Sequence, residues 1–289
     1  MKTVKHLGLL LILLLAFNSG FGQTVSDTTY WKNGGDFTLN FTQVSFTNWS
    51  AGGQNSVAGV SKFKYFARYE KSGVKWENLM DVGYGLSKVE GLEIQKSEDL
   101  IDFASNVGLK ASGFWSYNLG FSFKSQFAPG YSDATNTVKT SNFLSPAYLS
   151  LTAGMEYQPV EFFKLMLSPL SGKMTIVTDD EIDATNYGLE TADATTRMEL
   201  GATMLATLKT PIVKNVDLAT ELGLFSNYLD EPQNIDVDWK LGINMKINDY
   251  LSAQINTRLI YDEDIKDPVD DTAKIQFKEL LGIGLNFKF

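Results

Sequence analysis

The sequence contains no cysteine and only one histidine, His6. Without cysteine there is no disulfide framework and no site for a lipoprotein anchor. Nucleophilic catalysis by a Ser–His–acid triad or a Cys–His pair requires a histidine, and the usual zinc sites are built from Cys and His. These shortages argue against an enzyme, and we expect neither a metal site nor another cofactor.

Long hydrophobic runs are also missing. No segment reaches the about 18 apolar residues that indicate a membrane helix. The apolar run 7–17 follows a short basic start and precedes the small residues Gly20 and Gly22, which is the pattern of a secretory signal peptide. A membrane anchor is the alternative, but this run is too short to span a bilayer. We expect cleavage after Gly22, which assigns residues 1–22 to a signal peptide and removes His6.

Proline is scarce, with 7 residues, whereas glycine numbers 24 and aromatic residues make up 12% of the chain. The mean hydropathy of −0.11 is typical of a soluble protein. It is equally typical of a transmembrane β-barrel, because half of each strand faces water. The formal net charge is −9. Nucleic-acid binding needs clustered Lys and Arg, so this acidic balance argues against a nucleic acid as a partner.

The C-terminal segment 273–289 alternates between apolar and polar residues. Most of its apolar residues occupy odd positions: Ile275, Phe277, Leu281, Ile283, Leu285, Phe287 and Phe289. A period of two places odd and even positions on opposite faces of a β-strand. The aromatic ending, with Phe287 and Phe289, resembles the C-terminal insertion signal of bacterial outer-membrane β-barrels. This resemblance implies the barrel-assembly machinery as a partner.

The same alternation recurs along the whole chain. The expected strands are 37–46, 57–69, 74–84, 101–109, 113–127, 147–157, 163–177, 197–208, 216–224, 237–248, 251–261 and 273–289. Short turns and longer connections alternate between them, so both ends of the sheet lie on the side of the short turns. A soluble β-sandwich has no reason to keep this parity, whereas outer-membrane barrels do.

The pattern therefore predicts an all-β protein, a single antiparallel up-and-down transmembrane barrel of about twelve strands in the bacterial outer membrane. We assign residues 23–35 to an N-terminal lead-in and residues 36–289 to the barrel. The strand 273–289 should close the barrel against 37–46. Outer-membrane lipid and lipopolysaccharide are the expected surroundings of such a barrel.

The inward face of the barrel is the expected place for a transport function. Basic residues outnumber acidic ones at the predicted inward positions. The basic candidates for lining the lumen are Lys62, Lys64, Arg68, Lys124, Arg197, Lys240 and Arg258. Basic rings favour anions in a pore, which suggests a narrow, porin-like channel for a small solute. The alternative is that these charges pair across strands and close the lumen, which would make the barrel a structural or accessory protein.

Acidic residues gather in the longer connections, notably in 179–183 and 262–271. Clustered carboxylates can bind divalent cations and so bridge lipopolysaccharide phosphates. The run 262–271 lacks the glycine and the terminal glutamate of a calcium loop. We therefore interpret these runs as solvated faces of loops.

One motif lies outside the alternation. Asn48 and Trp49 are followed by Gly52 and Gly53 in the segment NWSAGG. Together with the exported twelve-strand pattern, this segment resembles the domain-of-unknown-function 3078 family of outer-membrane proteins. The family implies a barrel and no established activity. From the residues themselves we expect a tight loop, because glycine tolerates positive φ. Trp49 then lies either at the aromatic belt of the membrane interface or against a ligand.

Overall fold

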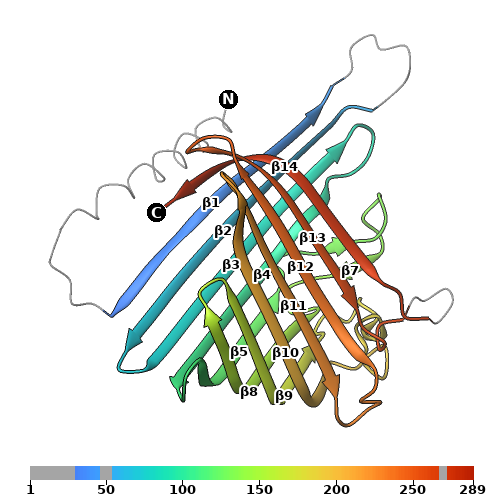
Figure 1. Ribbon diagram of the computed structural model, residues 1–289. Coiled ribbons are helices and arrows are strands. Elements are labelled where there is room, and N and C mark those ends of the chain that lie inside the picture. Colours follow the sequence, from blue (N-terminus) through green and yellow to red (C-terminus); the bar gives the residue numbers. More distant parts are fainter. Residues whose placement is uncertain (1–29, 46–53, 267–271) are drawn as a thin grey trace. The chain divides into compact units, whose positions relative to one another are not determined.

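The computed structural model describes residues 30–45, 54–266 and 272–289 (Figure 1). Its compact unit Trp31–Phe289 is the barrel. The expected signal peptide and the motif residues Asn48, Trp49, Gly52 and Gly53 lie outside the described residues. The predictions made for them therefore stay predictions.

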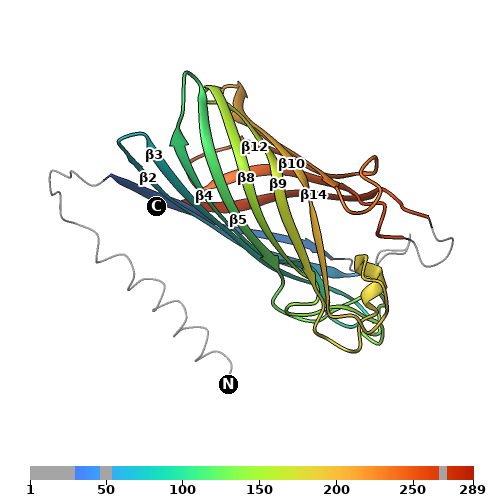
Figure 2. The ribbon, with the colours of Figure 1, turned by 90° about the horizontal axis from the view of Figure 1, so that it is seen from below.

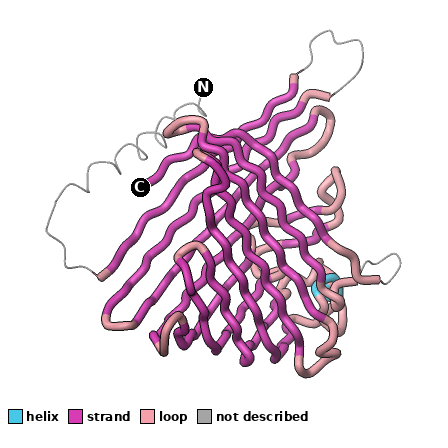
Figure 3. Tube along the Cα trace, in the orientation of Figure 1, coloured by secondary structure: helices cyan, strands magenta, loops and turns pink. Residues whose placement is uncertain are grey.

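The barrel is a closed antiparallel sheet of twelve strands, as the sequence predicts. Its strands are β1 (Trp31–Val44), β2 (Ser56–Lys71), β3 (Val74–Val89), β4 (Gln95–Lys110), β5 (Trp115–Ser125), β8 (Ala147–Val160), β9 (Phe163–Ile176), β10 (Thr196–Val213), β11 (Val216–Asn227), β12 (Ile235–Lys246), β13 (Leu251–Tyr261) and β14 (Gln276–Lys288). Each strand pairs with the next one along the barrel, and β14 pairs with β1 as expected. We call the end of the barrel with the short turns the turn side and the opposite end the loop side (Figure 3).

The alternation of the sequence becomes two faces of the barrel wall. On β14, Phe277 and Leu281 are 61% and 70% exposed on the outer face, whereas Gly284 on the inner face is buried. Aromatic side chains gather near the turn side, where Trp31 lies 5.3 Å from Tyr69 and 5.4 Å from Trp76, measured between ring centroids. Rows of exposed apolar side chains with an aromatic girdle are the outer surface of a membrane barrel.

Among the described residues, no helix is long and apolar enough to cross a membrane.

Several strand boundaries differ from the sequence-based expectation. Residues 31–35, expected in the lead-in, begin β1, where Trp31 pairs with Tyr69 of β2. Most of 85–99, expected as a long connection, continues the ladder between β3 and β4 up to the pair Ser87–Gln95. Polar residues there leave the apolar alternation, yet backbone pairing does not depend on side-chain polarity. The sheet therefore extends beyond its apolar band.

The longer connections on the loop side have structure of their own. The β5–β8 connection contains the small sheet of β6 (Gly130–Tyr131) and β7 (Lys139–Ser141), and the β9–β10 connection contains the 3₁₀ helix η2 (Ala184–Tyr187). Figure 2 shows both connections at the same end of the barrel. Four buried apolar residues form a hydrophobic cluster in the β9–β10 connection: Val177, Ile182, Ala184 and Leu189. This connection is thus a folded cap rather than only a solvated acidic run.

Candidate functional site: the charged lumen

The centre of the lumen is crossed by ion pairs between strands that are not neighbours. Lys124 of β5 has its Nζ 3.6 Å from Asp238 Oδ2 of β12, and Lys240 of β12 has its Nζ 3.8 Å from Asp102 Oδ2 of β4. At least four strands separate β12 from β4 and β5 along either way around the sheet. Side chains of such strands meet only in the interior, so these pairs span the lumen.

Two further contacts complete this central charge cluster. Arg258 of β13 donates from Nε and Nη2 to the two carboxylate oxygens of Asp238, each at 2.9 Å. Lys240 donates to Glu221 Oε1 at 3.0 Å. The cluster therefore contains as many basic as acidic side chains: Asp102, Lys124, Glu221, Asp238, Lys240 and Arg258. Their charges compensate one another rather than forming a basic ring.

A second crossing lies nearer the turn side. Lys164 of β9 has its Nζ 3.3 Å from Glu77 Oε2 of β3 and 3.5 Å from Glu156 Oε2 of the neighbouring β8. Arg68 of β2 also pairs with Glu77, and its guanidinium lies 4.8 Å from the centroid of the Phe66 ring. We call Arg68, Glu77, Glu156 and Lys164 the turn-side cluster.

A third cluster lies nearer the loop side. Lys173 of β9 has its Nζ 3.4 Å from Glu199, 3.1 Å from Asp236 and 3.7 Å from Asp262. Arg197 pairs with Glu199 at 3.6 Å and also with Asp264 in the β13–β14 connection. Three carboxylates surround one lysine, so the loop-side cluster carries a net negative charge around Lys173.

The structure brings all seven basic lumen candidates into ion pairs. Besides those above, Lys62 lies 4.0 Å from Glu98 and Lys64 lies 3.6 Å from Asp81. Of the two alternatives left open by the sequence, the described contacts favour paired charges over an unpaired basic lining. Among the described residues, no group of three or more His, Cys, Asp or Glu side chains could hold a metal ion.

The sequence pattern missed four charged residues of the lumen: Lys173, its partners Asp236 and Asp262, and Glu98, which lies beside Lys62. Lys173 was missed because β9 is irregular between Ser168 and Ser171, where its pairing with β10 shifts register. A bulge exchanges the faces of the residues that follow it. Pro169 in the middle of this strand was the available signal, since proline within a sheet is found at bulges.

The loop-side connections are tied to one another above the barrel strands. The backbone N–H groups of Thr178 and Asp179 both donate to Ser145 Oγ at 2.8 Å. Lys139 Nζ lies 3.1 Å from Asp179 Oδ2, and Asn142 Nδ2 donates to the same oxygen at 2.6 Å. The Asn142 hydrogen bond, together with Lys139, lowers the pKa of Asp179, and the partners Glu181 and Asp179 raise the pKa of Lys139. These contacts join the β5–β8 and β9–β10 connections.

Part of the chain matches a known family. The model of a family described as "Protein of unknown function (DUF3078)" matches residues 41–131. This range contains the NWSAGG segment. The resemblance expected from that segment is confirmed over this part of the chain. No curated protein matches the chain.

The chain is also similar to solved outer-membrane structures. The COG4313 outer membrane channel from Pseudomonas putida F1 is 11% identical, with a TM-score of 0.42 over 94% of this chain and 99% of that one. The translocator domain of the autotransporter NalP from Neisseria meningitidis is 11% identical, with a TM-score of 0.36 over 100% and 98%. Outer membrane phospholipase A from Escherichia coli is 8% identical, with a TM-score of 0.37 over 92% and 94%. The chain itself folds as a closed antiparallel β-barrel of twelve strands.

Proposed function

We propose that the protein is an integral barrel of the bacterial outer membrane whose lumen is closed to free diffusion by ion pairs that cross it. Small solutes would pass only when these pairs rearrange. The observation that carries this proposal is the pair of crossings Lys124–Asp238 and Lys240–Asp102, at 3.6 and 3.8 Å. Separating them leaves charges without partners in a partly dehydrated interior, which is unfavourable. The lumen would thus be closed at rest and would act as a narrow, gated conduit.

The location in the outer membrane is supported by the outer face of the barrel. An even number of strands, an outward apolar face and aromatic girdles are the features of outer-membrane barrels. We propose outer-membrane lipid and lipopolysaccharide as the surroundings of this face. The barrel-assembly machinery would recognise Phe287 and Phe289 before the barrel closes, since Phe289 exchanges two backbone hydrogen bonds with Gly35 of β1 in the closed barrel.

A freely open channel is the second candidate. It is favoured by Lys64 and Arg68, whose side chains are 54% and 51% exposed although both are ion-paired. Such exposure on the inner face of β2 indicates water in that part of the lumen. In a gated barrel this region would be a water-filled vestibule that ends at the central charge cluster. We further propose that the barrel is not an enzyme, which an assay for phospholipase and protease activity of the purified protein checks.

Single-channel recording in planar bilayers tests the proposal. The wild-type barrel should show only rare, brief openings. The double variant Lys124→Gln/Asp238→Asn removes one crossing at constant net charge and should conduct more often. The control Lys246→Gln/Asp249→Asn removes a pair outside the lumen crossings, with an Nζ–Oδ1 distance of 2.6 Å, and should behave like the wild type. A wild-type barrel that conducts steadily would contradict a closed lumen. If the double variant showed no channel openings, the gated conduit would be contradicted, and a structural or accessory barrel would be the remaining interpretation.

A further inference from the structure

The seam between β1 and β14 is paired over only part of its length. The pairs run from Asp36–Lys288 to Asn40–Gly284. Within the described residues, β1 continues past Asn40 to Val44. The strand β14 begins at Gln276, eight residues before Gly284. On its other side β1 pairs with β2 along its whole length. Toward the loop side the two strands diverge (Figures 1 and 2).

Within the part of the chain that the structure describes, this divergence leaves two strand edges, 41–44 and 276–283, without a partner strand. A lipid-exposed sheet edge is strongly disfavoured, because hydrocarbon offers no partners for backbone N–H and C=O groups. The free edges of 41–44 and 276–283 therefore need polar groups from lumen water or from a ligand. The loop-side half of the seam is an opening in the wall, and we call it the lateral opening.

Charged side chains lie behind the lateral opening. Lys278, on the part of β14 that is not paired with β1, reaches Glu98 Oε2 of β4 at 2.9 Å. Lys62 of β2 lies 4.0 Å from the same oxygen. One carboxylate thus faces two ammonium groups, and the surplus is positive. An anionic group that entered here would meet Lys278 and Lys62.

The point where the seam closes carries an unpartnered amide. Asn40 is only 9% exposed, and neither of its side-chain polar atoms has a hydrogen-bond partner within the described structure. Its Oδ1 would lie 2.0 Å from a Cβ at Gly284 and 3.8 Å from one at Gly282. The amide therefore points at two glycines of β14. It offers an NH₂ group as donor and a carbonyl oxygen as acceptor to a polar molecule at this point.

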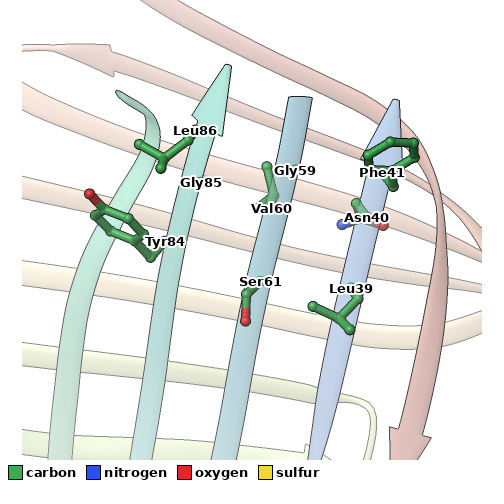
Figure 4. Close-up of a pocket in the computed structure, with 9 residues that line it drawn as sticks. All are labelled: Leu39, Asn40, Phe41, Gly59, Val60, Ser61, Tyr84, Gly85 and Leu86. Atoms are coloured by element: carbon green, nitrogen blue, oxygen red, sulfur yellow. The ribbon is translucent and has the colours of Figure 1, made fainter. Parts of the chain in front are cut away.

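An apolar groove lies on the barrel wall beside the lateral opening (Figure 4). Its floor is Gly59 and Ser61 of β2. The exposed side chains Leu39 and Phe41 of β1 line one side, and Tyr84 and Leu86 of β3 line the other. The small residues of β2 lie between larger side chains of β1 and β3, which leaves a groove in the outer face of the wall. In a membrane this face is surrounded by hydrocarbon. Such a groove is shaped for an extended alkyl chain.

We propose that the lateral opening and the apolar groove together bind an anionic amphiphile with an acyl chain. The chain lies in the groove, and the anionic headgroup passes between β1 and β14 to Asn40, Lys278 and Lys62. The opening would thereby connect the lumen laterally with the membrane leaflet on the loop side of the barrel. This inference rests on the proposed outer-membrane location, and it holds whether or not the lumen conducts ions along its axis.

Disulfide formation tests the opening itself, since the chain has no cysteine of its own. If the register of Asn40–Gly284 continued, Thr42 would face Gly282. The variant Thr42→Cys/Gly282→Cys should remain mostly reduced on oxidation in phosphatidylethanolamine–phosphatidylglycerol vesicles, because cysteines with Cα atoms more than about 7 Å apart cannot be bridged. The control Thr38→Cys/Asn286→Cys lies in the paired half and should cross-link readily. Equal cross-linking of both pairs would overturn the lateral opening.

Photolabelling tests the ligand, with a diazirine derivative of palmitic acid as the probe in the same vesicles. Labelled peptides should come mainly from β1, β2 and β3, whose residues line the groove. Gly59→Phe fills the groove and should abolish this labelling, and a Cβ there meets nothing nearer than Asn40 O at 4.0 Å. The matched control Gly172→Phe lies on β9, where a Cβ meets no atom within 4 Å, and should leave the labelling unchanged.

The headgroup is tested with Lys62→Gln/Lys278→Gln, which should reduce the labelling several-fold. The palmityl alcohol derivative, which lacks the carboxylate, should label weakly and be insensitive to this variant. Labelling spread evenly around the barrel and unaffected by Gly59→Phe would be ordinary lipid contact and would overturn the inference. A protein that does not insert into the vesicles at all, judged by its heat-modifiable migration, would instead overturn the proposed location and the inference with it.

Discussion

Lys164 of β9 and Glu77 of β3 form an ion pair of 3.3 Å across the interior of the barrel. Three strands of the sheet lie between them on the shorter way around. Together with the central and loop-side clusters, this pair links opposite walls at successive levels. Charges inside this barrel thus act first as cross-links of the wall. Any solute path through the lumen has to pass between them.

Replacement of Lys164 with Met should destabilise the barrel, because it leaves Glu77 and Glu156 with one partner fewer. Loss of a buried partner costs about 3–5 kcal/mol, and partial exposure of the Lys164 side chain, 34%, reduces our expectation to about 1–2 kcal/mol. Reversible urea unfolding in vesicles, followed by tryptophan fluorescence, measures the change. Lys246→Met on the turn side is the control and should cost less than about 0.5 kcal/mol. Equal effects of both variants would mean that crossing the lumen adds nothing.

The faces of most strands could be predicted from the sequence, because a period of two is a local property. On β14 the odd positions Phe277 and Leu281 face outward as expected. The rule fails where the backbone is irregular. Lys173 of β9 lies beyond the bulge near Pro169, and it faces the lumen although simple alternation from Lys164 places it outside.

The pairing of the lumen charges could not be predicted in the same way. The contact of Lys124 with Asp238 depends on how a closed barrel places β5 opposite β12, and alternation along one strand contains no information on that. The folded cap around Ile182 and Leu189 was missed for a related reason. Its apolar residues are spaced irregularly among acidic ones, and a cluster of this kind forms only when the connection folds back on itself.

The contact between the loop-side connections should depend on pH. The pKa of Asp179 lies below its ordinary value of 3.8 because of Asn142 and Lys139, so its contribution is present above that value and is lost as the pH falls through the lowered pKa. The pKa of Lys139 is raised above 10.5, so its contribution is lost only at strongly alkaline pH. Amide hydrogen exchange of 177–195, corrected for the intrinsic chemical rate, should therefore stay slow at neutral pH and accelerate below about pH 3.8.

Asp179→Asn provides the check on this pH dependence. The variant should exchange faster at neutral pH, and its exchange, corrected for the intrinsic chemical rate, should change less on acidification. Asp230→Asn in the β11–β12 connection is the matched control and should keep the wild-type profile. Identical profiles for wild type and Asp179→Asn would show that another group governs the opening of this connection.

Arg258→Lys should loosen the central charge cluster although it preserves the charge. Arg258 binds Asp238 through two parallel hydrogen bonds of 2.9 Å, and a lysine can reproduce only one of them. We expect a loss of about 1 kcal/mol in the free energy of unfolding and more frequent openings in planar bilayers. A double-mutant cycle with Asp238→Asn isolates the interaction. A coupling free energy near zero would show that the bidentate ion pair between Arg258 and Asp238 does not stabilise the barrel.

Phe289 should have two separable roles, one in assembly and one in the finished barrel. Its ring stacks on Phe63 with a centroid distance of 6.0 Å, and its backbone N–H and C=O pair with Gly35 at 3.1 and 3.0 Å. Phe63→Ala removes the stack but keeps the C-terminal signal. It should lower the free energy of unfolding, by about 0.5–1.5 kcal/mol for the ring–ring contact alone, and leave the yield of inserted barrel unchanged.

Deletion of Phe289 removes both the signal and the stack, so it should reduce the inserted yield as well as the stability. Heat-modifiable migration of outer-membrane fractions measures the yield, and urea unfolding of the purified barrel measures the stability. Leu285→Ala on the same outer face of β14 is the control for a general loss of apolar surface. If Phe63→Ala lowered the yield as much as the deletion does, recognition of the C-terminus could not be separated from closure of the β1–β14 seam.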